Sequence, residues 1–252
     1  MDKELIRRRF SRGRTTYTAQ ADAQVRIAGK MAGLISRYVP RASQRRVVEV
    51  GCGTGVFTRL LLNQTRPESL WLNDICPEMK DSLSDILGGR VSFHPGDAEQ
   101  TAFPDGQGLI ASCSAVQWFV SPERFFQRCA GLLADDGYFS FSTFGKQNLH
   151  EIATLTGHSL SYLSLEELKE VLQPHYQLVH ASEELIHLSF SSPLDVLKHL
   201  QATGVTGISR CAWTKGRLSD FCRRYEASYS DSDHRVGLTY HPIYIIAKKI
   251  AS

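Results

Sequence analysis

The chain has 252 residues, of which 42% are apolar and 22% charged, and its formal net charge is +3. This composition is typical of a globular protein and excludes a chain that is disordered throughout, and the small net charge does not favour a general nucleic-acid binder. No apolar run is long enough to span a bilayer, and the charged first ten residues do not have the pattern of a secretory signal.

A helix is predicted over residues 15–39, because apolar side chains recur there at steps of three and four before Pro40. From residue 47 short apolar runs alternate with helical segments, which predicts an α/β fold with a parallel sheet covered on both faces. The predicted strands are Val47–Val50, Leu70–Leu72, Val91–His94, Leu109–Cys113 and Tyr138–Thr143. The predicted helices are Val56–Asn63, Pro77–Leu87 and Pro122–Leu133, the last stopped by Asp135-Asp136-Gly137.

The last hundred residues depart from this alternation. A helix over Ser164–Leu172 opens with a Ser-x-x-Glu capping box. It is followed by predicted strands Tyr176–His180 and Glu183–Phe190, helices Pro193–Ala202 and Leu218–Tyr229, and a final strand Leu238–Lys248. We therefore predict an N-terminal helical lid at 1–44, an α/β core at 45–190, a helical insertion at 191–237 and a final core strand at 238–252.

The six cysteines form no C-x-x-C pair and no cluster with zinc spacing. We expect them to be reduced packing residues, which suits a cytoplasmic protein, and we expect no metal site.

A glycine-rich turn links the first predicted strand to the following helix. It reads Glu49-Val-Gly51-Cys-Gly53-Thr-Gly55. Glycines allow the tight turn and close backbone approach that a nucleotide-type ligand needs at the carboxyl end of a strand. A dinucleotide site prefers G-x-G-x-x-G, but Val56 stands where the third glycine is required. A nicotinamide oxidoreductase is therefore the less favoured class, and a plain structural turn is a further alternative.

Several residues after the next strands are candidates to hold such a ligand. Asp74 ends the second strand, where a carboxylate can accept both ribose hydroxyl protons, and a solvated loop Asp is its alternative. Ile75 and Met79 can sandwich an adenine ring, although Met79 can equally belong to a helix core. Asp97 and Ala98 follow the third strand and can read the adenine edge, unless Asp97 is simply a turn residue.

These residues resemble the class I S-adenosylmethionine-dependent methyltransferases. The similarity rests on EVGCGTG at 49–55, Asp74 and GDAE at 96–99, and it covers roughly residues 45–145. It implies a seven-stranded, mostly parallel Rossmann-like sheet whose last strand is antiparallel, with S-adenosyl-L-methionine as cofactor. Within it, Glu49 and the three glycines are cofactor-binding residues.

A narrower resemblance extends over nearly the whole chain. Phe10, Tyr17, Ala21 and Gln24, SAVQW at 114–118, ST at 142–143, SSPLDVLKHLQATGVTG at 191–207 and LTYHPIY at 238–244 are similar to the malonyl-[acyl-carrier protein] O-methyltransferases of biotin synthesis. The resemblance implies methylation of the free malonyl carboxylate, an early step toward pimelate. It also implies an acyl carrier protein as partner, with no nucleic acid or membrane. Tyr17, Gln24, Ser114 and Gln117 join the expected cofactor site.

The expected reaction needs no general base, because a carboxylate is already ionised at neutral pH. We expect Lys198 to hold the malonyl carboxylate, helped by His199, Tyr240, His241 and Trp118. Each has a structural alternative: a solvated lysine, a packed strand end, or a tryptophan that caps the core.

An acidic carrier protein predicts a basic docking face. The candidates are Arg7, Arg8, Arg9, Arg12, Arg14, Arg210, Lys215 and Arg217. Two other functions remain open: methylation of another small acid or a quinone ring, and a non-catalytic module that binds adenosylmethionine.

Overall fold

The computed structural model describes residues 2–8, 10–11, 22–204 and 214–250, and its centre is a seven-stranded sheet. The strand order is β3-β2-β1-β4-β5-β9-β6, and β9 runs antiparallel to both of its neighbours. The strands are β1 (Arg46–Val50), β2 (Ser69–Asp74), β3 (Val91–Pro95), β4 (Gln107–Cys113), β5 (Leu133–Phe144), β6 (Tyr176–Glu183) and β9 (Pro242–Lys249). The predicted fold class is confirmed.

Alternate side chains of the central strands enter two separate cores, one on each face of the sheet. In β1, Val47 belongs to one core, whereas Val48 and Val50 belong to the other. Such strands are buried on both sides, which explains why they read as continuous apolar runs. Helices α2 (Asp22–Tyr38) and α3 (Val56–Thr65) cover the first face, and α5 (Pro122–Leu132) and α7 (Leu165–Leu172) cover the second.

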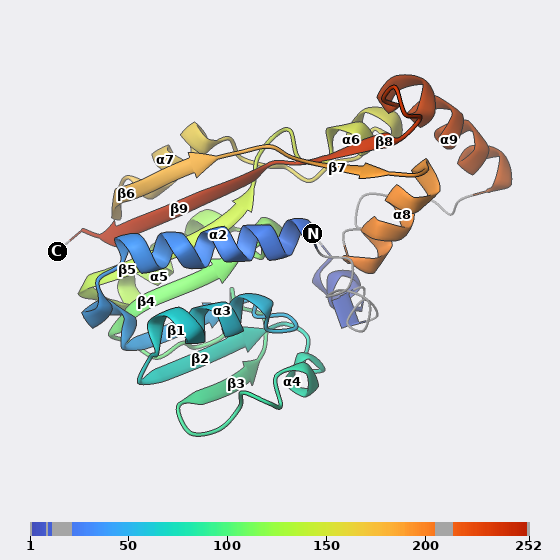
Figure 1. Cartoon of the computed structure of the whole chain (residues 1–252). Coiled ribbons are helices and arrows are strands. Elements are labelled where there is room, and N and C mark those ends of the chain that lie inside the picture. The colour runs from blue at the N-terminus through green and yellow to red at the C-terminus, as the bar shows by residue number, and fades with distance from the viewer. Residues whose placement is uncertain (1, 9, 12–21, 205–213, 251–252) are drawn as a thin grey trace.

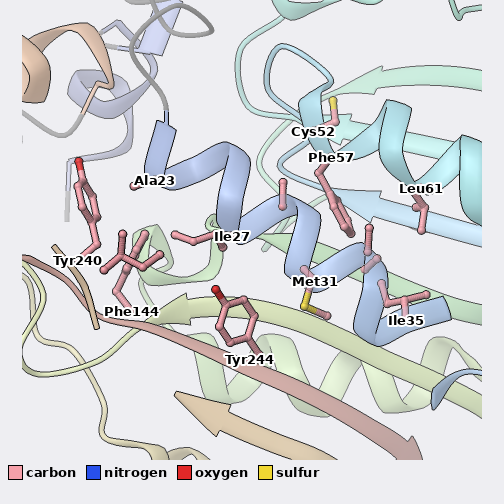
Figure 2. Packing of buried hydrophobic residues seen from close by; sticks show 14 of the residues in the cluster. Ala23, Ile27, Met31, Ile35, Cys52, Phe57, Leu61, Phe144, Tyr240 and Tyr244 are labelled. Carbon is pink, nitrogen blue, oxygen red and sulfur yellow. The ribbon is translucent and has the colours of Figure 1, made fainter. Parts of the chain in front are cut away.

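Helix α2 lies along the sheet with one apolar side turned inward (Figure 2). Ala23, Ile27, Met31 and Ile35 are fully buried and follow one another at steps of four residues. They pack with Phe57 of α3 and with aromatic residues of the late strands. Helix α2 begins at Asp22, so the first part of the helix predicted over 15–39 lies outside the described residues.

The helix predicted over Pro77–Leu87 is much shorter in the structure, so that prediction is wrong in its bounds. Helix α4 covers only Met79–Ser82, and turns follow it. In a continued helix the carbonyl of Ser82 would accept from Ile86, but it accepts from the Arg59 side chain at 2.8 Å. Ile86 donates instead to the carbonyl of Leu83, which also accepts from Leu87, so the chain continues in turns rather than in a regular helix.

The predicted final strand is two strands in different sheets. Strand β8 (Val236–Tyr240) pairs with β7 (Ile186–Phe190) in a small two-stranded sheet, whereas β9 belongs to the main sheet. The break falls at His241, whose amide donates to the side chain of Asn148, and at Pro242, which has no amide hydrogen for a ladder. Residues 135–137, predicted to stop a helix, lie inside β5.

The remaining helices lie toward the end of the main sheet at which the parallel strands stop (Figure 1). They are α6 (His150–Thr156), which the sequence did not predict, α8 (Pro193–Ala202) and α9 (Lys215–Tyr229). An N-terminal helix that includes residues 3–8 lies at the same end. Within the described residues, no helix has the length and apolar character needed to cross a membrane.

Gly108 of β4 provides a test of the close packing beneath the sheet. A Cβ atom there would collide with the backbone of Ser43, so Gly108→Ala should lower the free energy of unfolding by roughly 1–3 kcal/mol. Urea denaturation measures the change. Gly216→Ala in α9 is the matched control, since nothing lies within 4 Å of that Cβ, and its stability should be unchanged or raised. Equal stabilities of the two variants would contradict the packing.

Candidate active site

The glycine-rich turn after β1 is held against the end of β2. The amides of Gly51 and Cys52 both donate to the carbonyl of Asn73, at 2.8 and 3.0 Å. Gly51 has a φ of 72°, and a Cβ on it would collide with the side chain of Ala115. Glycine is therefore required here both for the backbone conformation and for the contact with the loop after β4.

The carboxylate of Asp74 joins this turn to the loop after β2. One of its oxygens accepts from the amide of Gly53 and the other from the amide of Cys76, both at 2.8 Å. Burial raises the pKa of Asp74, and these two hydrogen bonds act in the opposite direction. Each carboxylate oxygen keeps a further lone pair, so Asp74 can still accept from the hydroxyls of a ligand.

A cavity lies beside the turn and is bounded by the loops after β1, β2 and β4 and by the first turn of α2. Seven of the predicted site residues line it: Gln24, Gly51, Gly53, Asp74, Met79, Ser114 and Trp118. Phe10 also lines it, and its ring meets that of Trp118 edge to face at a centroid distance of 5.5 Å. We call this space the nucleoside cavity.

A smaller cavity of about 30 Å³ adjoins the nucleoside cavity. The two share Phe10, Gln24, Ser114 and Trp118. The smaller one is completed by Gln117, Phe144, Asn148, Tyr162, Thr203 and Tyr240. We call it the acyl cavity.

Four of the buried side-chain polar atoms that have no hydrogen-bond partner among the described residues lie at these two cavities. They are the side-chain oxygens of Gln24, Thr54, Ser114 and Gln117. Buried polar groups in a folded protein normally have partners. Their concentration here indicates a site that fits a polar ligand.

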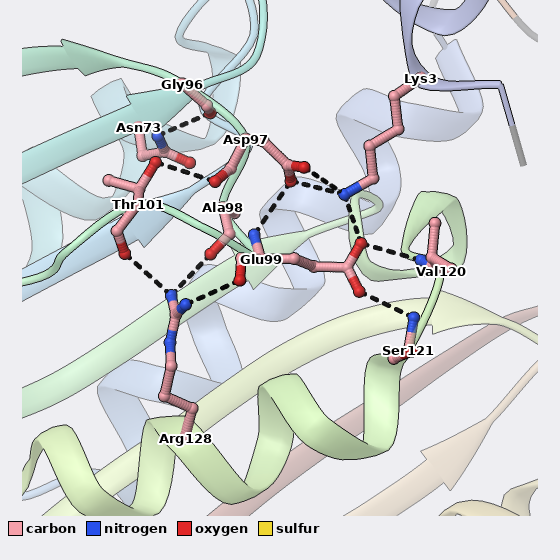
Figure 3. A network of polar contacts seen from close by, with 10 residues as sticks. All are labelled: Lys3, Asn73, Gly96, Asp97, Ala98, Glu99, Thr101, Val120, Ser121 and Arg128. Atoms are coloured by element: carbon pink, nitrogen blue, oxygen red, sulfur yellow. Dashed lines mark hydrogen bonds and ion pairs between the residues drawn. The ribbon is translucent and has the colours of Figure 1, made fainter.

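Asp97 and Ala98 do not line either cavity, and their assignment to the cofactor stays a prediction. The ammonium group of Lys3 donates to the Asp97 carboxylate at 2.6 Å and also pairs with Glu99 (Figure 3). Glu99 accepts from the amides of Val120 and Ser121. The N-terminal helix is thereby tethered to the loops after β3 and β4, a role of Lys3 that sequence reasoning missed because its partners lie more than ninety residues away.

Three further predicted cofactor residues stand apart from the nucleoside cavity. Gly55 begins α3 with a φ of 83°, and a Cβ there would collide with Arg59 and Leu83. Ile75 lines neither cavity, and Gln117 lines only the acyl cavity. Tyr17 lies outside the described residues.

Glu49 is buried under the glycine-rich turn and does not line the cavity. One oxygen accepts from Thr58 at 2.9 Å, and the other has no hydrogen-bond partner in the described part of the chain. Burial raises the pKa of Glu49 to about 8, partly opposed by the Thr58 hydrogen bond.

The predicted substrate residues are only partly brought together. Tyr240 lines the acyl cavity, and its hydroxyl lies 2.8 Å from Nε2 of buried His199. His241 lies outside the cavity, with Nδ1 accepting from the amide of Gln147 and Nε2 3.1 Å from Glu183. The predicted role of Lys198 is not supported, because its side chain is 73% exposed, pairs with Asp195 and lines neither cavity.

Sequence reasoning missed Asn148 and Tyr162. Neither belongs to a strand-end motif; they reach the cavity from the loops that flank α6. Among the described residues, no group of three or more His, Cys, Asp or Glu side chains is placed to hold a metal ion.

The chain is similar to known methyltransferases. A family model described as a methyltransferase domain matches residues 48–141, from β1 into β5. A malonyl-[acyl-carrier protein] O-methyltransferase of Bacteroides helcogenes is 46% identical over 98% of this chain and 99% of its own length. One of Bacteroides fragilis is 52% identical over 98% of this chain, which spans 50% of that longer relative.

The fold is also found in solved structures. The YcgJ protein of Bacillus subtilis superimposes with a TM-score of 0.63, covering 88% of this chain and 99% of that one, at 17% sequence identity. At this identity the similarity establishes the fold alone.

The buried carboxyl of Glu49 makes stability depend on pH. Its pKa is about 8 in the folded protein and near 4.5 in the unfolded chain. At pH values between these two, the carboxyl group is mostly ionised in the unfolded chain and mostly protonated in the folded protein. The free energy of unfolding should therefore fall as pH rises through this window, by up to about 1.4 kcal/mol per pH unit. Glu49→Gln should remove this dependence.

Urea denaturation of the ligand-free protein at pH 5.5 and pH 8 tests this. Glu170→Gln, on the exposed side of α7, is the control and should retain the wild-type pH dependence. Parallel pH profiles for the wild type and Glu49→Gln would contradict the assignment.

Proposed function

The chain belongs to the malonyl-[acyl-carrier protein] O-methyltransferase family, and we infer that it transfers the methyl group of S-adenosyl-L-methionine to the free carboxylate of malonyl-acyl carrier protein. The product is a methyl ester, and the reaction is an early step of pimeloyl and biotin synthesis. The observation that carries this inference is the similarity to such an enzyme along essentially the full length of both chains.

S-adenosyl-L-methionine is the methyl donor, and it supplies an electrophilic sulfonium methyl group. The side chains that line the nucleoside cavity match the chemical groups of this cofactor. Asp74 offers acceptor lone pairs for the ribose hydroxyls, and Met79 offers an apolar contact for the adenine. Thr54 and Ser114 present hydroxyls that have no partner among the described residues. The bend of the glycine-rich turn lets the backbone lie close to the ligand.

The acceptor needs no activation by a base. A carboxylic acid with a pKa near 4 is more than about 99% ionised at pH 7. What the enzyme must supply is alignment of a carboxylate oxygen with the methyl group, and such positioning can lower a barrier by roughly 7–11 kcal/mol. The acyl cavity, which shares Trp118 and Ser114 with the nucleoside cavity, is the place we assign to the acceptor.

We assign residues 1–44 to a lid and residues 191–237 to a substrate-side insertion on the core formed by 45–190 and 238–252. Phe10 reaches the nucleoside cavity, and Lys3 tethers the same helix to Asp97 and Glu99. In the insertion, Thr203 of the chain after α8 lines the acyl cavity. These contacts support the assignment of both segments to the substrate side of the site.

The docking face for the acidic carrier protein stays a proposal. Arg7 and Arg8 both pair with Glu4, which offsets part of their charge, whereas Lys215 and Arg217 lie exposed at the start of α9. Arg9, Arg12, Arg14 and Arg210 lie outside the described residues. We also propose a cytoplasmic location, since the five described cysteines are all unpaired thiols.

A methyl-transfer assay with labelled S-adenosyl-L-methionine tests the reaction. With malonyl-acyl carrier protein, label should appear as a methyl ester of the free malonyl carboxyl group. Acetyl-acyl carrier protein, which has no free carboxylate, is the control and should gain no label. Label at any other atom, as a quinone or amine methylase would give, contradicts the proposal, as does the absence of product.

Asp74→Ala should weaken cofactor binding by roughly 10- to 100-fold, because it removes a charged acceptor to which the ribose hydroxyls of the ligand can donate. Calorimetry with S-adenosylhomocysteine measures the affinity. The melting temperature should also fall, since the amides of Gly53 and Cys76 lose their acceptor. Asp85→Ala, which removes a carboxylate paired with Arg59 on the surface, is the control. Unchanged affinity in Asp74→Ala would refute the role of Asp74.

A further inference from the structure

The acyl cavity is lined by aromatic rings together with uncharged polar side chains. None of the described side chains around it carries a formal charge, and those that can form hydrogen bonds present hydroxyls, carboxamides and the indole of Trp118. Its volume of about 30 Å³ suits one or two waters or a group of similar size. A carboxylate is such a group.

The acyl cavity lies between the nucleoside cavity and a larger groove of about 530 Å³. The groove is bordered by the N-terminal helix, by residues 116–123 and by residues 159–163, and it shares Gln117, Trp118, Phe144 and Tyr162 with the acyl cavity. A linear acyl chain that lies in the groove can therefore end in the acyl cavity, beside the nucleoside cavity.

The hydrogen bonds around Tyr162 fix the direction in which its hydroxyl can donate. Oδ1 of Asn148 accepts from the backbone amide of His241 at 3.1 Å, so Nδ2 must face Tyr162. That Nδ2 donates to the Tyr162 hydroxyl oxygen at 3.0 Å. The phenolic proton consequently points away from Asn148, and among the described residues it has no hydrogen-bond acceptor of its own.

We propose that the Tyr162 hydroxyl donates a hydrogen bond to the terminal carboxylate of the acyl substrate and that Asn148 holds it in that orientation. Tyr162 is then a substrate-positioning residue, and the carboxylate is bound by a neutral donor rather than by a lysine or arginine. This assignment rests on the proposed methyl transfer to a malonyl carboxylate.

A neutral donor suits this reaction. A tightly paired cation would draw charge from the carboxylate oxygen that has to attack the methyl group, whereas a phenol orients the carboxylate with less withdrawal. Burial raises the pKa of Tyr162 to about 12, partly opposed by the hydrogen bond from Asn148, so the phenol keeps its proton throughout the neutral range. Tyr240, which is fully buried and lines the same cavity, is a second phenol whose pKa burial raises.

The contact should affect binding more than turnover. The carboxylate loses its charge as the ester forms, so the hydrogen bond from Tyr162 is stronger in the bound substrate than in the transition state. Tyr162→Phe should therefore raise the KM for malonyl-acyl carrier protein by roughly 10- to 100-fold and change kcat much less. Its affinity for S-adenosylhomocysteine should stay within about twofold of the wild-type value.

The decisive comparison is between malonyl- and acetyl-acyl carrier protein as ligands, measured by calorimetry in the presence of S-adenosylhomocysteine. The wild type should bind the malonyl form more tightly, and Tyr162→Phe should bind both alike. Tyr225→Phe is the matched control. The hydroxyl of Tyr225 donates to the carbonyl of Gly237 at 2.8 Å, and Tyr225 lines neither cavity. It should retain the preference for malonyl.

Asn148→Asp is a second, nearly isosteric variant for the case in which Tyr162→Phe does not fold. Its carboxylate can still accept from the amide of His241, but it would also accept the proton of Tyr162. The preference for malonyl should therefore disappear here too. If the wild type makes the methyl ester and both folded variants keep the malonyl preference, the inference is overturned while the proposed function stands. If the wild type makes no ester, the proposed function itself fails.

Discussion

The carboxylate of Asp74 is the interaction on which the cofactor side of the structure depends. It accepts from one amide in the turn after β1 and from another after β2, and so it joins these two loops beyond the last paired residues of their strands, Val50 and Asn73. Those loops form the wall of the nucleoside cavity. Because the carboxylate is buried, its desolvation is tolerated only while these donors are in place. The same group thus shapes the cavity and lines it.

The other side of the site is built from segments added to the sheet. The N-terminal helix reaches the cavity through Phe10 and is tethered by Lys3, while Asn148 and Tyr162 come from the loops around α6. Strand β8 delivers Tyr240 just before the chain turns at His241 and Pro242 into the main sheet. The acyl cavity therefore combines distant parts of the chain, whereas the nucleoside cavity is built mainly at the ends of β1, β2 and β4.

This difference explains what could be predicted from the sequence. The glycine-rich turn, Asp74 and the positions of strands β1 to β5 follow from local chemistry and apolar runs, whereas the seven-stranded sheet with an antiparallel last strand was implied by the resemblance. The shortened α4 was not predictable because it depends on a hydrogen bond from Arg59, an interaction that no local pattern reveals. Lys198 occupies a suitable helix but faces solvent, and helical periodicity alone did not show which side of α8 would be buried. Tyr162 and Asn148 lie in loops without periodicity.

Trp118 is the one described side chain that borders all three compartments: the nucleoside cavity, the acyl cavity and the groove. Any shift of this indole on filling one compartment alters the walls of the other two. Where filling one compartment moves the indole, the occupancies are linked, and the linkage is reciprocal: the factor by which the methyl donor changes affinity for the acyl chain equals the factor by which the acyl chain changes affinity for the donor.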